Sequence, residues 1–355
     1  MIFALWCCVS WSVTASATDG LAETMVREAR DAAPAGEPDA IITRIDRATQ
    51  AELRSCAAWA QAERVMNGNE ALQACPLQAF HSSVALDNLR GDKKRAKFGR
   101  RVFKPPRGWG LPKDAVHLCA FLAGLFRTGT LPPNVSAVRT AGLVLIDVGA
   151  AFGGETVVGG ELGFEVVAFE PHPAEWARLH AAWGRRPRTQ IINAAVTRAP
   201  SNMTLYAAED SSTLEKHAIH NEHATQVKAQ REDLRSVTVR GVSIDSDLRR
   251  VSTIDPARVA VIKLDIQGHE YEALAGAIKL IREHHPVLYF EYAPNFFKGA
   301  HEADVNKILC LAMLVGGYEC TIPRRGELAF CVPTSPRPKH KSRVLHLASD
   351  AYMDS

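Results

Sequence analysis

The sequence predicts an α/β fold with a doubly wound, mostly parallel sheet and a helical N-terminal extension. After Leu143, short apolar runs rich in β-branched residues alternate with segments of helical periodicity. The apolar runs are residues 143–148, 165–169, 189–196, 259–264 and 286–290. Such alternation is typical of parallel strands joined by crossover helices. Because most of these runs are almost continuously apolar, we expect helices on both faces of the sheet and a ligand crevice at the carboxyl ends of the strands.

Two segments before the sheet also have helical periodicity. Apolar residues recur at helical spacing in residues 40–65 and in residues 112–128. Between these segments, residues 90–111 carry a basic run followed by two prolines, which predicts a linker. We therefore expect four parts, namely a candidate signal peptide (1–17), a helical extension with a basic linker (18–111), the main domain (112–332) and a basic tail (333–355).

Composition argues against several classes of protein. The 355 residues are 46% hydrophobic and 23% charged, which is typical of globular proteins. The net charge of +3 is too small for a protein devoted to nucleic acid, and we expect no stable nucleic-acid partner. The basic runs at residues 90–107 and 337–343 are interpreted as solvated linkers, with binding to an acidic glycan, a phospholipid surface or nucleic acid as the alternative.

The N-terminus leaves two cellular locations open. Residues 1–17 are apolar and end in small residues, as signal peptides do, but an apolar terminus of the fold has the same composition. No run reaches the roughly 20 apolar residues of a membrane-spanning helix, so no transmembrane span is expected. Entry into the secretory pathway would make Asn134 and Asn202 candidate N-glycosylation sites, since each begins an Asn-x-Ser/Thr triplet.

Cysteine and histidine spacing does not predict a metal site. The eight cysteines form no CxxC pair and no matching Cys/His cluster. In an oxidising compartment, Cys56 with Cys75 and Cys320 with Cys331 are candidate disulfides. Histidines also recur at a spacing of three in an insertion that could form a lid over a substrate, at His217, His220 and His223. Without a cysteine or acidic ligand they are interpreted as a polar helix face.

Polar residues follow the first two predicted strands. The first strand ends in Asp147, and the turn after it contains Gly149 and Gly153. Glycines allow positive φ and close approach of the backbone to a ligand, while Asp147 can accept hydrogen bonds from an ammonium group. The second strand ends in Glu170, at the separation of about 20 residues that places a carboxylate on the ribose hydroxyls of a nucleoside.

The acidic character of this turn favours S-adenosyl-L-methionine over NAD. The turn lacks the GxGxxG spacing that brings a helix N-terminus to a pyrophosphate. Asp147 would repel a phosphate but would attract the cationic amino-acid portion of an adenosyl ligand. An NAD-dependent oxidoreductase is the less favoured alternative.

Five segments, in order, resemble the FkbM-type methyltransferases, which are class I S-adenosylmethionine-dependent enzymes. They read IDVGAAFGGET, VVAFEPHP, INAAV, VIKLDIQGHEYEALAGA and PVLYFEY, and the resemblance extends over residues 143–322. It implies a Rossmann-like fold with Asp147, Gly149 and Gly153 on the methionine portion of the cofactor. It also implies Glu170 on the ribose and Asn193–Ala194 at the edge of the adenine. The family usually has Asn where this chain has Ala151, and frequently has Glu where it has Gln267.

Candidate catalytic residues follow the fourth and fifth predicted strands. Methyl transfer from a sulfonium to an alcohol benefits from a base within reach of the alcohol proton. His269 suits this role by its ordinary pKa and Asp265 by its position, although His269 could instead be an exposed first-turn residue without a chemical role. Glu270 belongs to the same site or complements the helix dipole. Glu291, after four apolar residues, should face the same crevice.

The sequence therefore predicts a methyltransferase that moves the methyl group of S-adenosyl-L-methionine to an oxygen of a small-molecule or glycan acceptor. A non-catalytic binding module with the same fold is the alternative class. Retention of Asp147, Glu170, Asp265 and Glu270 together favours catalysis.

Overall fold

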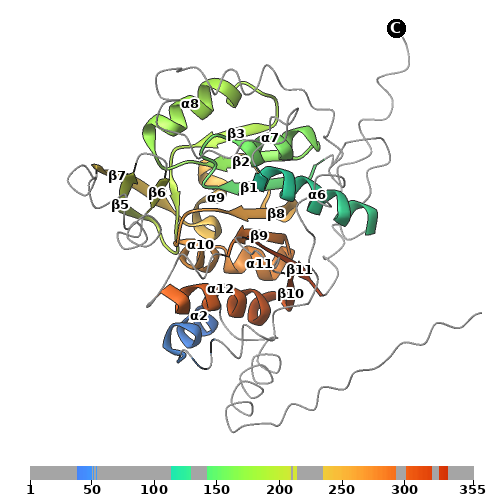
Figure 1. Ribbon diagram of the computed structural model, residues 1–355, viewed down its shortest axis with the longest axis vertical. Helices are drawn as coiled ribbons and strands as arrows, with labels where there is room; N and C mark the ends of the chain where they lie inside the picture. The colour runs from blue at the N-terminus through green and yellow to red at the C-terminus, as the bar shows by residue number, and fades with distance from the viewer. Residues whose placement is uncertain are drawn as a thin grey trace, which may run out of the picture.

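The protein is built on a central sheet of seven strands (Figure 1). The computed structural model describes residues 38–49, 51, 53, 113–128, 142–208, 211–213, 235–292, 301–321 and 328–334. The strands are β1 (Val144–Val148), β2 (Glu165–Phe169), β3 (Thr189–Ile192), β8 (Val259–Leu264), β9 (Val287–Glu291), β10 (Tyr318–Thr321) and β11 (Leu328–Pro333). Their order across the sheet is β10-β11-β9-β8-β1-β2-β3.

Five neighbouring strands of this sheet run parallel, from β3 to β9, and β11 and β10 complete it in antiparallel pairings. The chain moves outward from β1 through β2 to β3 and then returns to β8 on the other side of β1. The strand order thus reverses between β1 and β8, and open α/β sheets bind ligands at such a switch point, beyond the carboxyl ends of the strands. The prediction of a doubly wound, mostly parallel sheet is confirmed.

Helices cover both faces of the sheet, as the apolar strands require. One face packs against α6 (Lys113–Thr128), α7 (Gly154–Glu161) and α8 (Pro173–Trp183). The other packs against α2 (Pro38–Arg47), α9 (Ile244–Val251), α10 (Glu270–Ala275), α11 (Ile278–His284) and α12 (His301–Gly316). The short 3-10 helix η6 (Pro256–Arg258) precedes β8. Alternate side chains of β1 enter the two cores, Leu145 on one face and Ile146 on the other.

A second, smaller sheet projects beside the central one, at the left of Figure 1. It contains β4 (Ala195–Val196), β5 (Ser201–Ala208), β6 (Ser211–Thr213) and β7 (Arg235–Val242), in the order β4-β7-β5-β6. The prediction of one strand over residues 189–196 was wrong, because the chain leaves the central sheet after Ile192 and pairs with β7 from Ala195. Asn202 and Thr204 are both exposed on β5, whereas Asn134 and the three spaced histidines lie outside the described residues.

Helix α2 is attached to the main domain by both apolar and ionic contacts. Ile42 and Ile45 enter the core beside α12, and Arg198 donates to Asp46 at 2.7 Å. The hydroxyl of Tyr271, in α10, donates to the same carboxylate at 2.9 Å. Of the predicted helical extension (18–111), the structure thus describes α2, whereas α6 falls within the predicted main domain; residues 1–17, the basic linker and the tail from residue 335 lie outside the described residues. None of the helices within the described ranges combines the length and the apolar character needed to cross a membrane.

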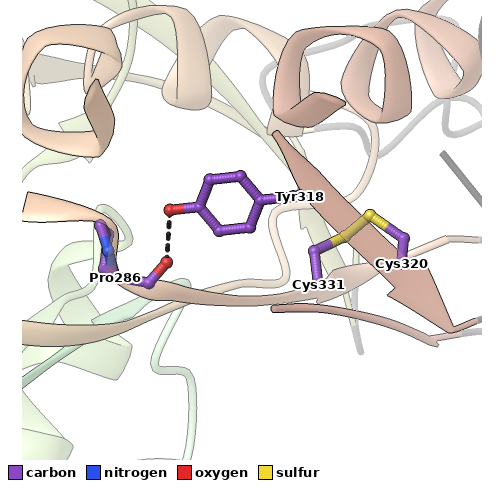
Figure 2. The surroundings of a disulfide bond; sticks show 4 residues. All are labelled: Pro286, Tyr318, Cys320 and Cys331. Carbon is purple, nitrogen blue, oxygen red and sulfur yellow. Dashed lines mark hydrogen bonds between the residues drawn. A yellow bond between two sulfur atoms is a disulfide. The ribbon is translucent and has the colours of Figure 1, made fainter. Parts of the chain in front are cut away.

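Figure 2 shows the disulfide between Cys320 and Cys331, which are directly opposite each other on β10 and β11. Both residues are buried. Next to them, the hydroxyl of Tyr318 donates to Pro286 O at 2.6 Å and ties β10 to the start of β9. This disulfide is one of the two pairs that the sequence offered for an oxidising compartment; the other, Cys56 with Cys75, lies outside the described residues.

Candidate active site

A buried ion pair lies under the switch point between β1 and β8. Asp147 and Lys263 are register partners on these strands, and Lys263 Nζ is 3.0 Å from Asp147 Oδ1. The ammonium also donates to Gly149 O at 2.8 Å, while Thr156 Oγ1 donates to Asp147 Oδ2 at 2.6 Å. Burial disfavours the charge, but the attraction of Asp147, Glu155 and Asp265 outweighs it and raises the pKa of Lys263.

The ion pair changes the expected role of Asp147. Sequence reasoning offered its carboxylate to the ammonium group of a ligand, but both of its oxygens face side chains of the protein, and the residue is fully buried. Asp147 therefore acts on the turn through Lys263, and a direct contact with a ligand stays a prediction. Lys263 was not identified as a site residue from sequence, although a lysine inside the apolar strand VAVIKL is a usable signal, since buried charges are almost always paired.

The turn after β1 is held against the ends of β2 and β8. The amides of Gly149 and Ala150 both donate to Phe169 O at 3.0 Å. Gly149 has a φ of 76°, and a Cβ at this position would lie 1.9 Å from Asp265 O. Gly153 has a φ of 81°, and its Cβ would lie 2.5 Å from Leu179 Cδ1. The two glycines are therefore required by backbone conformation and by packing within the protein.

Glu170 connects the end of β2 to this turn. Its Oε2 accepts a hydrogen bond from Ala151 N at 2.8 Å, and its Oε1 accepts one from His172 N at 2.8 Å. Burial raises the pKa of Glu170, and the two amide donors oppose that increase. A carboxylate offers about four lone-pair positions, so these two bonds leave capacity for hydroxyl donors. Ala151 has a φ of 43°, a conformation that Asn adopts more readily than Ala, which gives a physical reason for the Asn usual in the family.

Asn193 lies beside Glu170, and its predicted place at the edge of the adenine stays a prediction. Its Nδ2 donates to Glu170 O at 2.9 Å and to Pro171 O at 3.1 Å, so this amide holds the chain that follows β2. Ala194 is buried, and its amide donates to Ile192 O at 3.1 Å. The carboxyl ends of β2 and β3 thus form one surface with the turn after β1.

Sequence reasoning also missed Phe152, in the middle of the same turn. It is 53% exposed and is the one exposed large hydrophobic residue within the described ranges, and the guanidinium of Arg178 lies 5.5 Å from the ring centroid. An exposed aromatic ring on a turn of this kind can stack on a planar ligand.

The turn after β8 is closed by Glu270. Its Oε1 accepts from Ile266 N at 2.8 Å and its Oε2 from Gly268 N at 2.9 Å. Burial raises the pKa of Glu270 to about 7. Both carboxylate oxygens thus bind backbone amides of the turn, which explains why an acidic residue is needed at this position.

Asp265 and Glu291 are brought together at the ends of β8 and β9. Gln267 lies between them, and its Nε2 donates to Asp265 Oδ1 at 3.1 Å and to Glu291 Oε2 at 2.9 Å. All three residues are partly exposed, in contrast to the buried Glu270. The predicted juxtaposition of Asp265 and Glu291 is therefore present in the fold.

His269 contacts the segment that follows β4. It is buried rather than exposed, and its Nε2 is 3.1 Å from Thr197 Oγ1, in the segment that follows β4. Thr197 O also approaches Gly276, at the other end of α10. These contacts favour a packing role for His269 between α10 and the second sheet.

The chain also matches the model of a known family. Residues 147–319 match the family model described as the methyltransferase FkbM domain. The chain contains a methyltransferase FkbM domain. Within the described ranges, no group of three His, Cys, Asp or Glu side chains is placed to hold a metal ion.

Several solved structures are similar to this chain. The FkbM methyltransferase from Methylobacillus flagellatus KT is 16% identical, with a TM-score of 0.36 over 70% of this chain and 60% of its own, so the match spans less than two thirds of that protein. A SAM-dependent methyltransferase from Agrobacterium tumefaciens is 11% identical, with a TM-score of 0.30 over 66% of each chain. No curated protein matches the chain.

The buried ion pair leads to a first prediction. Lys263→Met retains the side-chain stem but leaves Asp147 buried without its partner, and this should lower the free energy of unfolding by about 3 to 5 kcal/mol. As a control, Arg249→Met removes an exposed guanidinium 3.9 Å from Asp255, and it should cost less than about 1 kcal/mol. Urea unfolding of the two variants measures the difference. If both variants lose only a small and equal amount of unfolding free energy, the buried pair of Lys263 and Asp147 does not stabilise the fold.

A second prediction concerns Glu270 and pH. Its folded pKa of about 7 lies above the unfolded value of 4.5, so the folded state binds the proton more tightly. Its contribution to stability is fully present below pH 4.5 and is lost as the pH rises through about 7. The free energy of unfolding in urea should be lower at pH 8 than at pH 5 for the wild type, and this difference should be smaller for Glu270→Gln. As a control, Glu319→Gln changes an exposed carboxylate on β10 and should show the same difference between the two pH values as the wild type. If Glu270→Gln also shows the wild-type difference, the pH dependence belongs to other groups.

Proposed function

We propose that this domain binds S-adenosyl-L-methionine across the carboxyl ends of β1, β2 and β3 and transfers its methyl group to an oxygen of a sugar or another small molecule. The observation that carries the proposal is the hydrogen bond between Ala151 N and Glu170 Oε2. It joins the glycine turn and the acidic residue into one surface beside the switch point, where a nucleoside would meet both.

The charges around α7 support this cofactor over NAD. A dinucleotide would place its pyrophosphate at a helix N-terminus that follows the first strand. Here Glu155 is buried in the first turn of α7, and Asp147 is buried directly before the turn that leads to it. Lys263 pairs with Asp147, so Glu155 is the carboxylate that opposes a pyrophosphate here, whereas a cationic sulfonium and ammonium are compatible with it.

Each residue has a role in this proposal. Glu170 accepts hydrogen bonds from the ribose hydroxyls, Asn193–Ala194 lies along the adenine, and the turn from Gly149 to Gly153 holds the methionine portion. When bound, the cofactor would supply a methyl group on a positively charged sulfur, and the acceptor oxygen would form a bond to the methyl carbon, in line, as the carbon–sulfur bond breaks.

The acceptor side is formed by the ends of β8 and β9. An alcohol acceptor loses its proton as the oxygen–methyl bond forms, and a partly exposed carboxylate can accept that proton. Asp265 and Glu291 are such carboxylates, whereas Glu270 uses both oxygens to close the turn. We therefore assign proton acceptance to Asp265, with Glu291 orienting the acceptor.

The cofactor assignment predicts different effects on cofactor binding for Glu170 and Glu165, which lie at opposite ends of β2. Calorimetry should detect binding of S-adenosylhomocysteine and no heat with NAD. Glu170→Ala should weaken this binding by about 2 to 5 kcal/mol, because two charge-assisted hydrogen bonds to the ribose are lost. Glu165→Ala removes a carboxylate at the opposite end of β2, which pairs with Arg258, and should leave the affinity unchanged. NAD binding, or equal affinities for both variants, would overturn the assignment.

The catalytic assignment predicts different losses for Asp265 and His269. With labelled methyl transfer to a panel of glycans, small alcohols and proteins, Asp265→Asn should abolish turnover while the protein still binds S-adenosylhomocysteine. His269→Ala should match Thr197→Val, because each removes the same hydrogen bond, and both should retain turnover within about tenfold. A loss of about 100-fold or more in His269→Ala alone would make the histidine the base.

A further inference from the structure

Gln267 donates both hydrogens of its side-chain amide to carboxylates at the ends of two different strands. Its Nε2 lies 3.1 Å from Asp265 Oδ1 and 2.9 Å from Glu291 Oε2. Asp265 follows β8 and Glu291 ends β9, and these two strands are parallel neighbours in the sheet. The amide NH2 group provides two donors, one for each carboxylate.

The amide is suited to this position by charge as well as by shape. Two carboxylates at adjacent strand ends repel each other, which raises the free energy of their charged forms. A neutral donor between them offsets that repulsion without the strong field of a lysine or arginine. The orientation of the amide follows from its neighbours, because its carbonyl oxygen would repel both carboxylates.

The backbone at Gln267 is fixed from both sides. Gln267 has a φ of 55°, in the left-handed region that few residues other than glycine adopt, and Gly268 follows with a φ of 102°. Glu270 binds the amides of Ile266 and Gly268, the residues on either side. A backbone held in an unfavourable conformation by hydrogen bonds on both sides is typical of a functional position.

We propose that Gln267 is a positioning residue that holds Asp265 and Glu291 together as one hydrogen-bonded unit facing the methyl acceptor. This proposal rests on the proposed function, because it assigns Asp265 and Glu291 to the acceptor side. Gln267 itself takes no proton; it acts through the two carboxylates by donating a hydrogen bond to each and by fixing their orientation.

Other charged groups also act on these carboxylates. Lys263 lies below them in β8 and attracts Asp265, while Glu270 repels it from α10. Asp147, on β1, neutralises much of the lysine charge through the buried ion pair. A change at Gln267 leaves these groups in place, so a shift in the titration of Asp265 or Glu291 reports on the amide.

The test uses two replacements at Gln267 and a matched control. Gln267→Glu keeps the shape of the side chain but replaces the donors with a third carboxylate, and Gln267→Met removes the donors without adding charge. Gln190→Glu makes the same chemical change on β3, where the amide bonds to Thr253 and Glu165. Carbon-13 carboxyl signals, assigned by their loss in Asp265→Asn and Glu291→Gln, are titrated in each protein, and S-adenosylhomocysteine binding is measured in parallel.

The proposal requires the apparent pKa of the Asp265 and Glu291 pair to rise by about one unit or more in Gln267→Glu, and by less in Gln267→Met. Gln190→Glu should titrate as the wild type does. With an acceptor from the panel, both Gln267 variants should lose about tenfold or more of the rate at neutral pH, while the affinity for S-adenosylhomocysteine stays within about twofold.

Wild-type titration curves in both Gln267 variants would overturn the proposal, as would a fall in cofactor affinity as large as the fall in rate. Failure of the wild type to bind S-adenosylhomocysteine would instead contradict the proposed function. The carboxyl titrations would still decide whether Gln267 couples the two carboxylates, since they require neither cofactor nor acceptor.

Discussion

The candidate site depends on the contact between Lys263 and Asp147. A buried ammonium and a buried carboxylate are stable only when they are paired and when their remaining hydrogen-bonding groups are satisfied. Here Thr156 supplies the remaining hydrogen bond to Asp147, and the Gly149 carbonyl accepts one from Lys263. The lysine therefore joins β1, β8 and the glycine turn, and so fixes the turn after β1 relative to the end of β8.

The two turns that follow β1 and β8 are in direct contact. Gly149 lies against Asp265 O so closely that no larger residue fits, and each turn is closed by a buried carboxylate. Glu170 holds the first turn through Ala151, and Glu270 holds the second through Ile266 and Gly268. Positive φ angles at Ala151 and Gln267 persist because these bonds stabilise them. The site is thus preorganised by groups that are themselves withdrawn from solvent, while Asp265, Gln267 and Glu291 stay partly exposed.

Much of this arrangement follows from local sequence patterns. The apolar runs and the residues after them predicted the strands of the parallel sheet, and Glu170 could be placed because parallel strands end at one edge. The environment of His269 could not be predicted from the residues next to it in the sequence. Its position after Gly268 suggested an exposed first-turn residue or a base, but the imidazole of His269 is buried and contacts Thr197, 72 residues earlier in the chain. The break between β3 and β4 has the same cause, since Ala195 pairs with Gly241 across the insertion.

The sequence by itself determined the α/β class, the glycine turn, the acidic strand ends and the FkbM methyltransferase resemblance, because each is encoded within a few consecutive residues. The tertiary structure decided which polar groups stay partly exposed and which are buried against partners in the protein. Asp147 and Glu270 bind partners inside the protein, whereas Asp265 and Glu291 share the amide of Gln267. The physical reason is that hydrogen-bond partners are set by distances between strands that are far apart in the chain, and the spacing of residues along one strand carries no information about them.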